Sequence, residues 1–110
     1  MRTPADGPRP SNASGQPNNP FIQFNLGEAH RRLQAYEIAA KFFQRAAALK
    51  SDFAEAYASA GDAYRLMGQG TDAERCYRAA LKRAPAMLAA LNGLGLLRLQ
   101  HGDAAAAAER

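Results

Sequence analysis

Cysteine is nearly absent from this chain, since Cys76 is the only one among its 110 residues. A single thiol cannot close an internal disulfide, and without a CxxC pair it cannot contribute to a zinc knuckle. We interpret Cys76 as a small packing residue and expect a reducing, cytoplasmic compartment, because disulfides form mainly in oxidising ones. The two histidines, His30 and His101, lie far apart in the sequence. We therefore predict neither a metal site nor any other cofactor.

Patterns that carry catalysis are missing as well. The sequence shows no nucleophile–base pair, no phosphate-binding glycine loop and no carboxylate pair suited to acid–base chemistry. Glu28 and His30 have i,i+2 spacing, so their side chains point away from each other on a helix. We predict a half-buried packing role for His30 and no enzymatic activity for the chain.

Long apolar runs and clustered charge are also lacking. The longest apolar stretch, residues 86–99, is too short to span a bilayer and contains Asn92 and Arg98. The 14 basic and 10 acidic residues are interleaved, which gives a net charge of +4 and a pI of ≈ 9.6. Nucleic-acid binding favours a basic stripe or basic residues interleaved with aromatic ones, and neither is present. We expect no membrane span and no nucleic-acid partner.

The N-terminal segment, residues 1–19, has no large aliphatic side chain after Met1 and is rich in Pro, Gly, Ser and Asn. Such a segment buries too little apolar surface to offset the entropy that it loses on ordering. It also lacks the apolar core of a secretory signal. We predict a disordered N-terminal arm over residues 1–19.

A pattern of small and aromatic residues repeats along the rest of the chain. Its clearest copy lies in residues 54–85 and consists of Tyr57, Ala60, Gly61, Tyr64, Ala73, Tyr77, Ala80 and Pro85. A shift of 34 residues towards the N-terminus reaches Leu26, Gly27, Ala39, Phe43 and Ala46. The same shift towards the C-terminus reaches Leu94, Gly95 and Ala107. Three copies in register are stronger evidence than one match to a loose pattern.

This pattern resembles the tetratricopeptide repeat, a helix–turn–helix unit of 34 residues. The resemblance implies an all-α fold in which antiparallel helix–turn–helix repeats stack as a short right-handed superhelical solenoid, an alpha-alpha superhelix. It predicts a repeat domain over residues 20–110, with repeats at 20–53, 54–87 and 88–110, of which the last is truncated.

The spacing within the central repeat also predicts how its two helices pack. Tyr57, Gly61 and Tyr64 lie on one face of the first helix. We expect Gly61 and Ala73 to lie where the helices cross, because small residues let two backbones approach each other. Tyr77 then fills the space beside that crossing.

Local signals mark where helices begin and end. Asn19 can cap the first helix, with Pro20 at its first position. Capping boxes are predicted for the two helices of the central repeat from Asp52 with Glu55 and Thr71 with Glu74. In the first repeat Gln34 replaces the usual turn glycine. In the third repeat we predict a turn at residues 101–103 and a second helix over residues 104–110.

In the tetratricopeptide repeat family the first helix of each repeat lines a concave groove, which holds a peptide or a partner's helix. The resemblance implies a protein–protein interaction module. By position it assigns the groove to Phe24, Asn25, Glu28, Arg31, Ser59, Asp62, Arg65, Asn92, Leu96 and Leu99. We expect this groove to be charged at one end and apolar at the other, with Phe24 as a candidate anchor.

The groove set contains two acid–arginine pairs, Glu28–Arg31 and Asp62–Arg65, with i,i+3 spacing. Each pair can act on a ligand, or it can simply support its own helix by about 0.2–0.5 kcal/mol. We interpret each pair in the second way, and the surface as a whole as a groove.

One class of ligand is set aside. Chaperone-docking members of the family hold a C-terminal carboxylate with lysine, asparagine and arginine side chains. The matching positions in this sequence are Phe24, Glu28, Ser59, Ala89 and Gly93. None of them is a cation, so a carboxylate terminus finds no charge-assisted donor there.

Other roles stay open. The chain can be the N-terminal, substrate-positioning repeat segment of a larger bacterial transferase, with which its Arg- and Ala-rich composition is compatible, or a helical-repeat protein that binds single-stranded RNA. We also predict self-association at the C-terminal end. Leu91 and Leu94 face a predicted second helix whose apolar residues are all alanine. Either the natural protein continues past Arg110, or the two leucines meet their copies in a two-fold homodimer, which we expect for this chain.

Overall fold

The computed structural model describes residues 18–108, with side chains described for residues 18–100 and 102. The described chain forms five helices: α1 (Pro20–Arg32), α2 (Tyr36–Leu49), α3 (Ala54–Leu66), α4 (Gly70–Arg83) and α5 (Leu88–Ala108). No strand occurs among these residues, and the predicted all-α fold is confirmed. The predicted disordered arm, residues 1–19, lies outside the described residues apart from Asn18 and Asn19.

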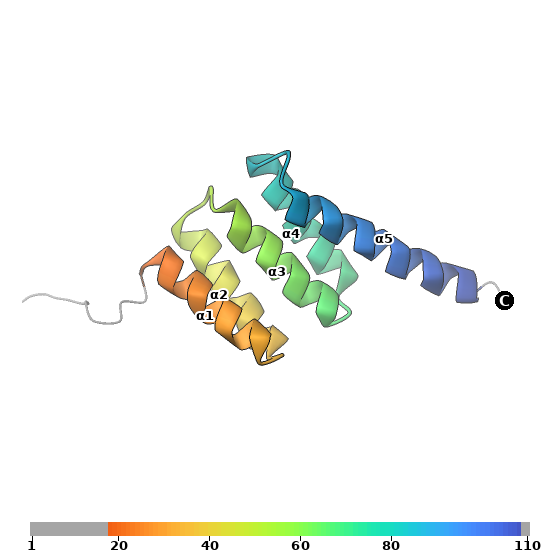
Figure 1. The fold of residues 1–110 in the computed structure, drawn as a ribbon, viewed down its shortest axis with the longest axis horizontal. Coiled ribbons are helices and arrows are strands. Elements are labelled where there is room, and N and C mark those ends of the chain that lie inside the picture. Colours follow the sequence, from red (N-terminus) through yellow and green to blue (C-terminus); the bar gives the residue numbers. More distant parts are fainter. Residues whose placement is uncertain (1–17, 109–110) are drawn as a thin grey trace, which may run out of the picture.

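The helices run antiparallel in chain order and form two layers (Figure 1). α1, α3 and α5 make up one layer, in which α3 contacts both of the others, and α2 and α4 make up the second. Each helix also packs on the next one along the chain. This is the stacking of helix–turn–helix units that the repeated pattern predicts.

The two helices of a repeat cross where an aromatic ring lies against a glycine. A Cβ atom added to Gly27 would lie 2.6 Å from a ring atom of Phe43, and one added to Gly61 would lie 2.7 Å from a ring atom of Tyr77. Non-bonded carbon atoms prefer separations of about 3.5–4.0 Å, so only glycine fits at either position. Both rings are fully buried, as is Ala73. The prediction that Gly61 lies at the crossing is confirmed.

The predicted N-terminal cap of α1 is also confirmed. Asn19 Oδ1 accepts hydrogen bonds from the backbone N–H groups of Phe21 at 2.8 Å and Ile22 at 3.2 Å. Pro20 occupies the first helical position, where the missing N–H group costs no hydrogen bond.

The two predicted capping boxes, Asp52 with Glu55 and Thr71 with Glu74, are wrong. α3 begins directly after Phe53 and α4 begins at Gly70, and neither start has a side-chain cap. Asp52 therefore lies too early to cap α3. Its carboxylate instead accepts a hydrogen bond from Lys50 Nζ at 2.7 Å, which lowers the pKa of Asp52. Thr71 lies inside α4 rather than before it.

The turn predicted at residues 101–103 is wrong as well. α5 continues without a break through this segment to Ala108, so residues 104–108 do not form a separate second helix. Alanine has the highest intrinsic helix propensity, whereas a single glycine costs a helix only about 1 kcal/mol. Folding back would bury nothing larger than alanine methyl groups, so intrinsic propensity decides the outcome.

Two turns use the left-handed backbone conformation. Gly68 has a φ of 81°, and Gln34, at the matching position of the first repeat, has a φ of 64°. An L-residue with a Cβ atom is disfavoured in this conformation by roughly 1–2 kcal/mol. The first turn is therefore strained, and the second is not.

Replacing Gln34 by glycine should stabilise the protein. Gln34→Gly removes the Cβ atom from the left-handed position and is expected to raise the free energy of unfolding by about 1 kcal/mol, after the added flexibility of the unfolded chain is subtracted. Urea denaturation measures the change. The reverse substitution at the matching position, Gly68→Ala, should lower the free energy of unfolding, and a stabilising effect of both would contradict the assignment of strain.

Gly61→Leu should be strongly destabilising, because the new side chain overlaps the ring of Tyr77. Overpacking of this kind typically costs about 1–3 kcal/mol. Gly95 provides a matched control, since a Cβ atom added there meets nothing within 4 Å. Gly95→Leu is expected to leave the melting temperature unchanged or raise it. If both variants melt alike, contact with the ring is not the reason for glycine at position 61.

Candidate functional site

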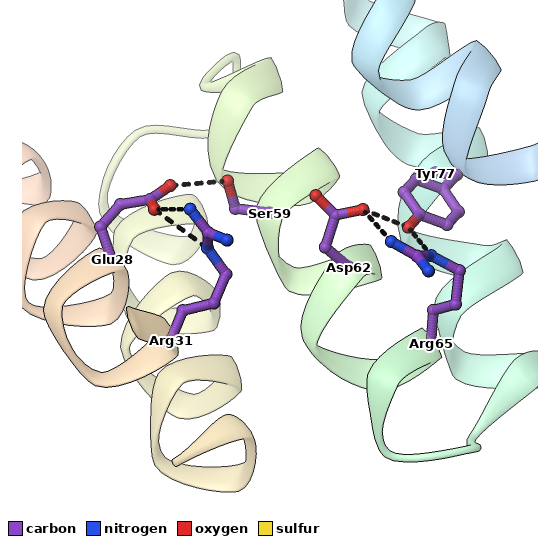
Figure 2. Close-up of polar contacts among 6 residues, drawn as sticks. All are labelled: Glu28, Arg31, Ser59, Asp62, Arg65 and Tyr77. Atoms are coloured by element: carbon purple, nitrogen blue, oxygen red, sulfur yellow. Dashed lines mark hydrogen bonds and ion pairs between the residues drawn. The ribbon is translucent and has the colours of Figure 1, made fainter. Parts of the chain in front are cut away.

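The residues assigned to a groove all lie on α1, α3 and α5, and the structure divides them into groups. Glu28 contacts both Arg31 and Ser59, and Asp62 and Arg65 share a contact with Tyr77. Phe24 is half-buried, and the remaining residues are exposed: Asn25, Asn92, Leu96 and Leu99. The polar residues therefore form two separate clusters on neighbouring helices (Figure 2).

The Glu28 cluster, made of Glu28, Arg31 and Ser59, joins α1 to α3. Glu28 Oε1 accepts hydrogen bonds from Arg31 Nε at 3.0 Å and Arg31 Nη2 at 2.5 Å. Glu28 Oε2 accepts a third from Ser59 Oγ on α3 at 3.3 Å. The arginine side chain keeps 37% of its surface exposed and the glutamate 21%. The predicted i,i+3 pair is present, and it also forms a polar contact between neighbouring repeats.

The Tyr77 cluster, made of Asp62, Arg65 and Tyr77, joins α3 to α4. The hydroxyl of Tyr77 donates a hydrogen bond to Asp62 Oδ1 and accepts one from Arg65 Nε at 3.1 Å. Arg65 Nη2 also lies 3.4 Å from Asp62 Oδ1. Only 16% of the Arg65 side chain is exposed. The sequence predicted Tyr77 as a packing residue alone, and the role of its hydroxyl depends on tertiary contacts that the repeated pattern does not encode.

Burial and charge together set the protonation of the Tyr77 cluster. Burial raises the pKa of Tyr77 well above its usual range, and the hydrogen bond to Asp62 raises it further, although Arg65 acts in the opposite sense. Burial alone would lower the pKa of Arg65, but its contacts with Tyr77 and Asp62 outweigh this effect and raise it. At neutral pH a neutral phenol therefore bridges the carboxylate and the guanidinium.

The apolar residues of the predicted groove differ in the surface that they offer. Phe24 packs on Phe43 and Phe53, with ring centroids 5.5 Å and 5.1 Å away, so most of its ring belongs to the core. Leu96 and Leu99 on α5 keep 44% and 65% of their surface exposed. The apolar end of the predicted groove therefore depends on α5 rather than on Phe24.

α5 packs on the preceding repeat through Ala90, Gly93, Leu94 and Leu97. Gly93, one of the positions compared with a carboxylate-binding residue, is buried, and a Cβ atom added there would overlap the ring of Tyr77. Leu94, predicted to self-associate with Leu91, is half-buried against Tyr77 and its neighbours, whereas Leu91 is exposed. The two leucines therefore do not form one exposed pair.

An open cleft of about 740 Å³ lies between the adjoining ends of α3 and α4 and the second half of α5. It is lined by Arg65, Gly68, Gly70, Thr71, Glu74, Leu94, Leu97, Arg98, Gln100 and Gly102. The sequence did not predict this cleft, because its wall requires α5 to continue straight past the predicted turn. Only the position of α5 brings these residues together.

Cys76 and His30, which were considered for catalysis or metal binding, are packed against other side chains. Cys76 is half-buried, and burial raises the pKa of its thiol to about 11, which makes it a poor nucleophile at neutral pH. His30 stacks on Phe42, with ring centroids 5.3 Å apart and planes 9° from parallel. Among the side chains that the structure describes, no three His, Cys, Asp or Glu residues gather as a metal site requires. None of the described helices is both long and apolar enough to cross a membrane.

Comparisons with known proteins agree with this architecture. Residues 13–54 and 59–109 match the family model of the tetratricopeptide repeat. No curated protein sequence matches the chain. Among solved structures, the chain is similar to the first TPR of Spaghetti (RPAP3) bound to HSP90 peptide SRMEEVD, with a TM-score of 0.75 and 25% identity over 79% of this chain and 69% of that one.

Two further solved structures show the same likeness. The second TPR domain of human RPAP3, in complex with HSP70 peptide SGPTIEEVD, has a TM-score of 0.71 and 25% identity over 74% of this chain and 68% of that one. The Sgt2 TPR domain from Aspergillus fumigatus has a TM-score of 0.78 and 22% identity over 86% of this chain and 64% of that one, which shows a shared fold.

Tyr77→Phe tests the polar contact while keeping the ring. Loss of the hydroxyl is expected to cost about 0.5–1.5 kcal/mol at neutral pH, the net contribution of a typical hydrogen bond. The pKa of Tyr77 is raised in the folded state, so this stabilisation is complete below a pH of about 10 and is lost as the pH rises further. Urea denaturation across a pH series should show the two proteins converging at alkaline pH.

Comparing the wild type with Tyr77→Phe isolates the effect of the Tyr77 hydroxyl on the free energy of unfolding. Cys76 and Tyr64, whose pKa values burial also raises, titrate in both proteins, so their effects cancel in the difference. A difference in the free energy of unfolding that stays constant across the alkaline range would mean that the Tyr77 hydroxyl does not titrate with folding.

Proposed function

The chain belongs to the tetratricopeptide repeat family, and we propose that it is a protein-interaction module that binds a peptide or helix of a partner along α1, α3 and α5. The observation that carries the proposal is a row of partly exposed polar clusters on α1 and α3, followed on α5 by exposed leucines. Two similar RPAP3 domains, which are described with bound HSP90 and HSP70 peptides, support the same kind of role.

The Glu28 cluster has hydrogen-bonding capacity beyond its internal contacts. A guanidinium group carries five N–H donors, and Arg31 directs Nε and Nη2 to Glu28. The remaining donors, on a side chain that is 37% exposed, can bind backbone carbonyls or a carboxylate of a ligand. Because Glu28, which Ser59 also binds, holds the arginine in place, Arg31 loses little conformational freedom when a ligand binds.

The partner segment that fits this surface is polar at one end and apolar at the other. Carbonyl or carboxylate groups would lie over the Glu28 cluster, and apolar side chains would lie over Leu96 and Leu99. Burying apolar surface contributes about 25 cal/mol per Å², so the α5 end would supply most of the affinity and the arginine would fix the register of the ligand.

The ligand is proposed to differ from a chain terminus held by cations. Of the positions compared with the carboxylate-binding residues, Phe24 is packed in the core and Gly93 is buried under Tyr77. Glu28 carries a negative charge that already binds Arg31 and Ser59. We therefore propose an internal segment of the partner rather than its C-terminal carboxylate.

The test of the groove uses peptides that bind the wild-type chain, selected from a displayed library of random sequences. Arg31→Glu and Leu99→Asp change the two ends of the proposed surface, and each is expected to weaken the selected peptides by about tenfold or more, equivalent to about 1.4 kcal/mol. Lys82→Glu is the matched control, since Lys82 is exposed on α4 in the opposite layer. Fluorescence anisotropy measures affinity, and circular dichroism verifies that each variant is folded.

The proposed surface fails if the selected peptides bind the wild type and both groove variants equally well. It also fails if Lys82→Glu alone weakens them, because the binding surface would then lie on the layer of α2 and α4.

A further inference from the structure

One side of α5 has no covering element among the described residues. It is formed by Leu91, Asn92, Gly95 and Arg98, all exposed, and we call it the open face of α5. A shift of 34 residues relates it to Tyr57, Ala58, Gly61 and Tyr64 on α3, and a second such shift relates it to Gln23, Phe24, Gly27 and His30 on α1. On α3 and α1 these sides are covered by α4 and α2.

α5 itself packs on the protein through a different side. Ala90 is fully buried, Leu94 and Leu97 pack on the same buried cluster, and Gly93 lies against the ring of Tyr77. The open face is therefore not needed to hold α5 in place. α5 lies at the end of the row of helices, in contact with α3 and α4 (Figure 1). A ligand on the open face would therefore displace no part of the described fold.

Gly95 marks the position where a ring would fit. At Gly27 and Gly61 an added Cβ atom meets the ring of Phe43 or Tyr77, whereas at Gly95 nothing lies within 4 Å. Gly95 on α5 therefore leaves room for a ring, at the position where Gly27 on α1 and Gly61 on α3 each contact one.

The two covering helices show which side chains fit such a face. Each presents an alanine, an aromatic residue four positions later and a second alanine three positions after that: Ala39, Phe43 and Ala46 on α2, and Ala73, Tyr77 and Ala80 on α4. All six are fully buried, with 0% of their surface exposed. The chain therefore contains two examples of the complement to this face, on α2 and α4.

We propose that the open face of α5 binds a helix of a partner protein that carries the pattern Ala-x-x-x-aromatic-x-x-Ala, with the aromatic ring against Gly95. Residues 78–110 contain no Phe, Tyr or Trp, so none of them supplies such a ring. The site is centred on Gly95, which is not part of the proposed peptide-binding surface, although the two adjoin on α5 at Leu96 and Leu99.

The neighbouring residues favour a phenylalanine in the partner. Around Tyr77, the hydroxyl is bound by Asp62 and Arg65, and the corresponding residues on α5 are Leu96 and Leu99. Leucines offer no partner for a phenol. Leaving a hydroxyl without a hydrogen bond in an apolar contact is unfavourable, so the face is expected to prefer a phenyl ring.

A second copy of the chain matches this face less well. Its fully buried rings, Phe43 and Tyr77, are not available without unfolding α2 or α4. Of the predicted dimer pair, Leu94 is half-buried against the core, which leaves Leu91 alone on the open face. A leucine is smaller than the rings of Phe43 and Tyr77, which lie against the matching faces of α1 and α3.

The test uses the full chain and a fluorescent peptide with the sequence of residues 70–83, in which Cys76 is replaced by alanine and Tyr77 by phenylalanine. Two control peptides carry tyrosine or alanine at the ring position. The expected order of affinity, measured by fluorescence anisotropy, is phenylalanine, then tyrosine, then alanine, with the alanine peptide weaker than the phenylalanine peptide by about tenfold or more. Equal binding of the three peptides would overturn the proposal.

Gly95→Ala and Gly102→Ala form a matched pair of protein variants. Both replace an exposed glycine of α5 that has nothing within 4 Å, and both should raise the melting temperature because alanine favours a helix. Only Gly95→Ala places a methyl group where the ring should lie. It is expected to weaken the phenylalanine peptide by about tenfold or more while Gly102→Ala has no effect.

Two outcomes would exclude the proposed site. If Gly95→Ala binds the peptide as the wild type does, the peptide has instead displaced α4 or bound elsewhere. If sedimentation of the chain alone shows a dimer that both Leu91→Glu and Gly95→Ala abolish, a second copy covers the face. Both results depend on Gly95, which lies outside the peptide-binding surface, whereas Arg31→Glu tests that surface at its other end on α1. Failure of this site is therefore distinguishable from failure of the peptide-binding surface.

Discussion

The contact between an aromatic ring and a glycine backbone fixes how closely the helices of this chain approach one another. Tyr77 illustrates how much depends on it, because its ring lies against Gly61 on α3 and Gly93 on α5. That position also carries its hydroxyl to Asp62 and Arg65. A single side chain on α4 therefore sets the spacing of two helices and supports a polar cluster beside them.

The polar clusters contribute more to the shape of the surface than to its stability. Exposed ion pairs contribute about 0–1 kcal/mol, and Arg31 remains partly exposed. Their effect is to hold charged groups in defined orientations. Glu28 keeps both carboxylate oxygens occupied, one by Arg31 on its own helix and the other by Ser59 on the next. Charged side chains that are already ordered form a more selective surface than mobile ones do.

The sequence predicted the parts of this structure that are encoded by spacing. The glycine and aromatic positions repeat in register, so the crossing at Gly61 was foreseen, and so was the cap at Asn19. The turn at residues 101–103 was predicted wrongly, because a turn glycine acts only when the following segment gains by folding back, and a run of alanines gains little. The Tyr77 hydroxyl contact and the cleft beside α5 depend on where whole helices lie, which no local signal records. The assignments of a groove and of self-association remain predictions.

Each of the described helices contacts only helices that are one or two places away from it in chain order. α1 touches α2 and α3, and α5 touches α3 and α4, with no contact between α1 and α5 among the described residues. In such a one-dimensional arrangement each unit is stabilised by the units beside it. Backbone amides of α3, which has neighbours on both sides, should therefore exchange with solvent most slowly, and those of α1 and α5 fastest. Order would be lost from either end inwards, and one end could open while the other stayed intact.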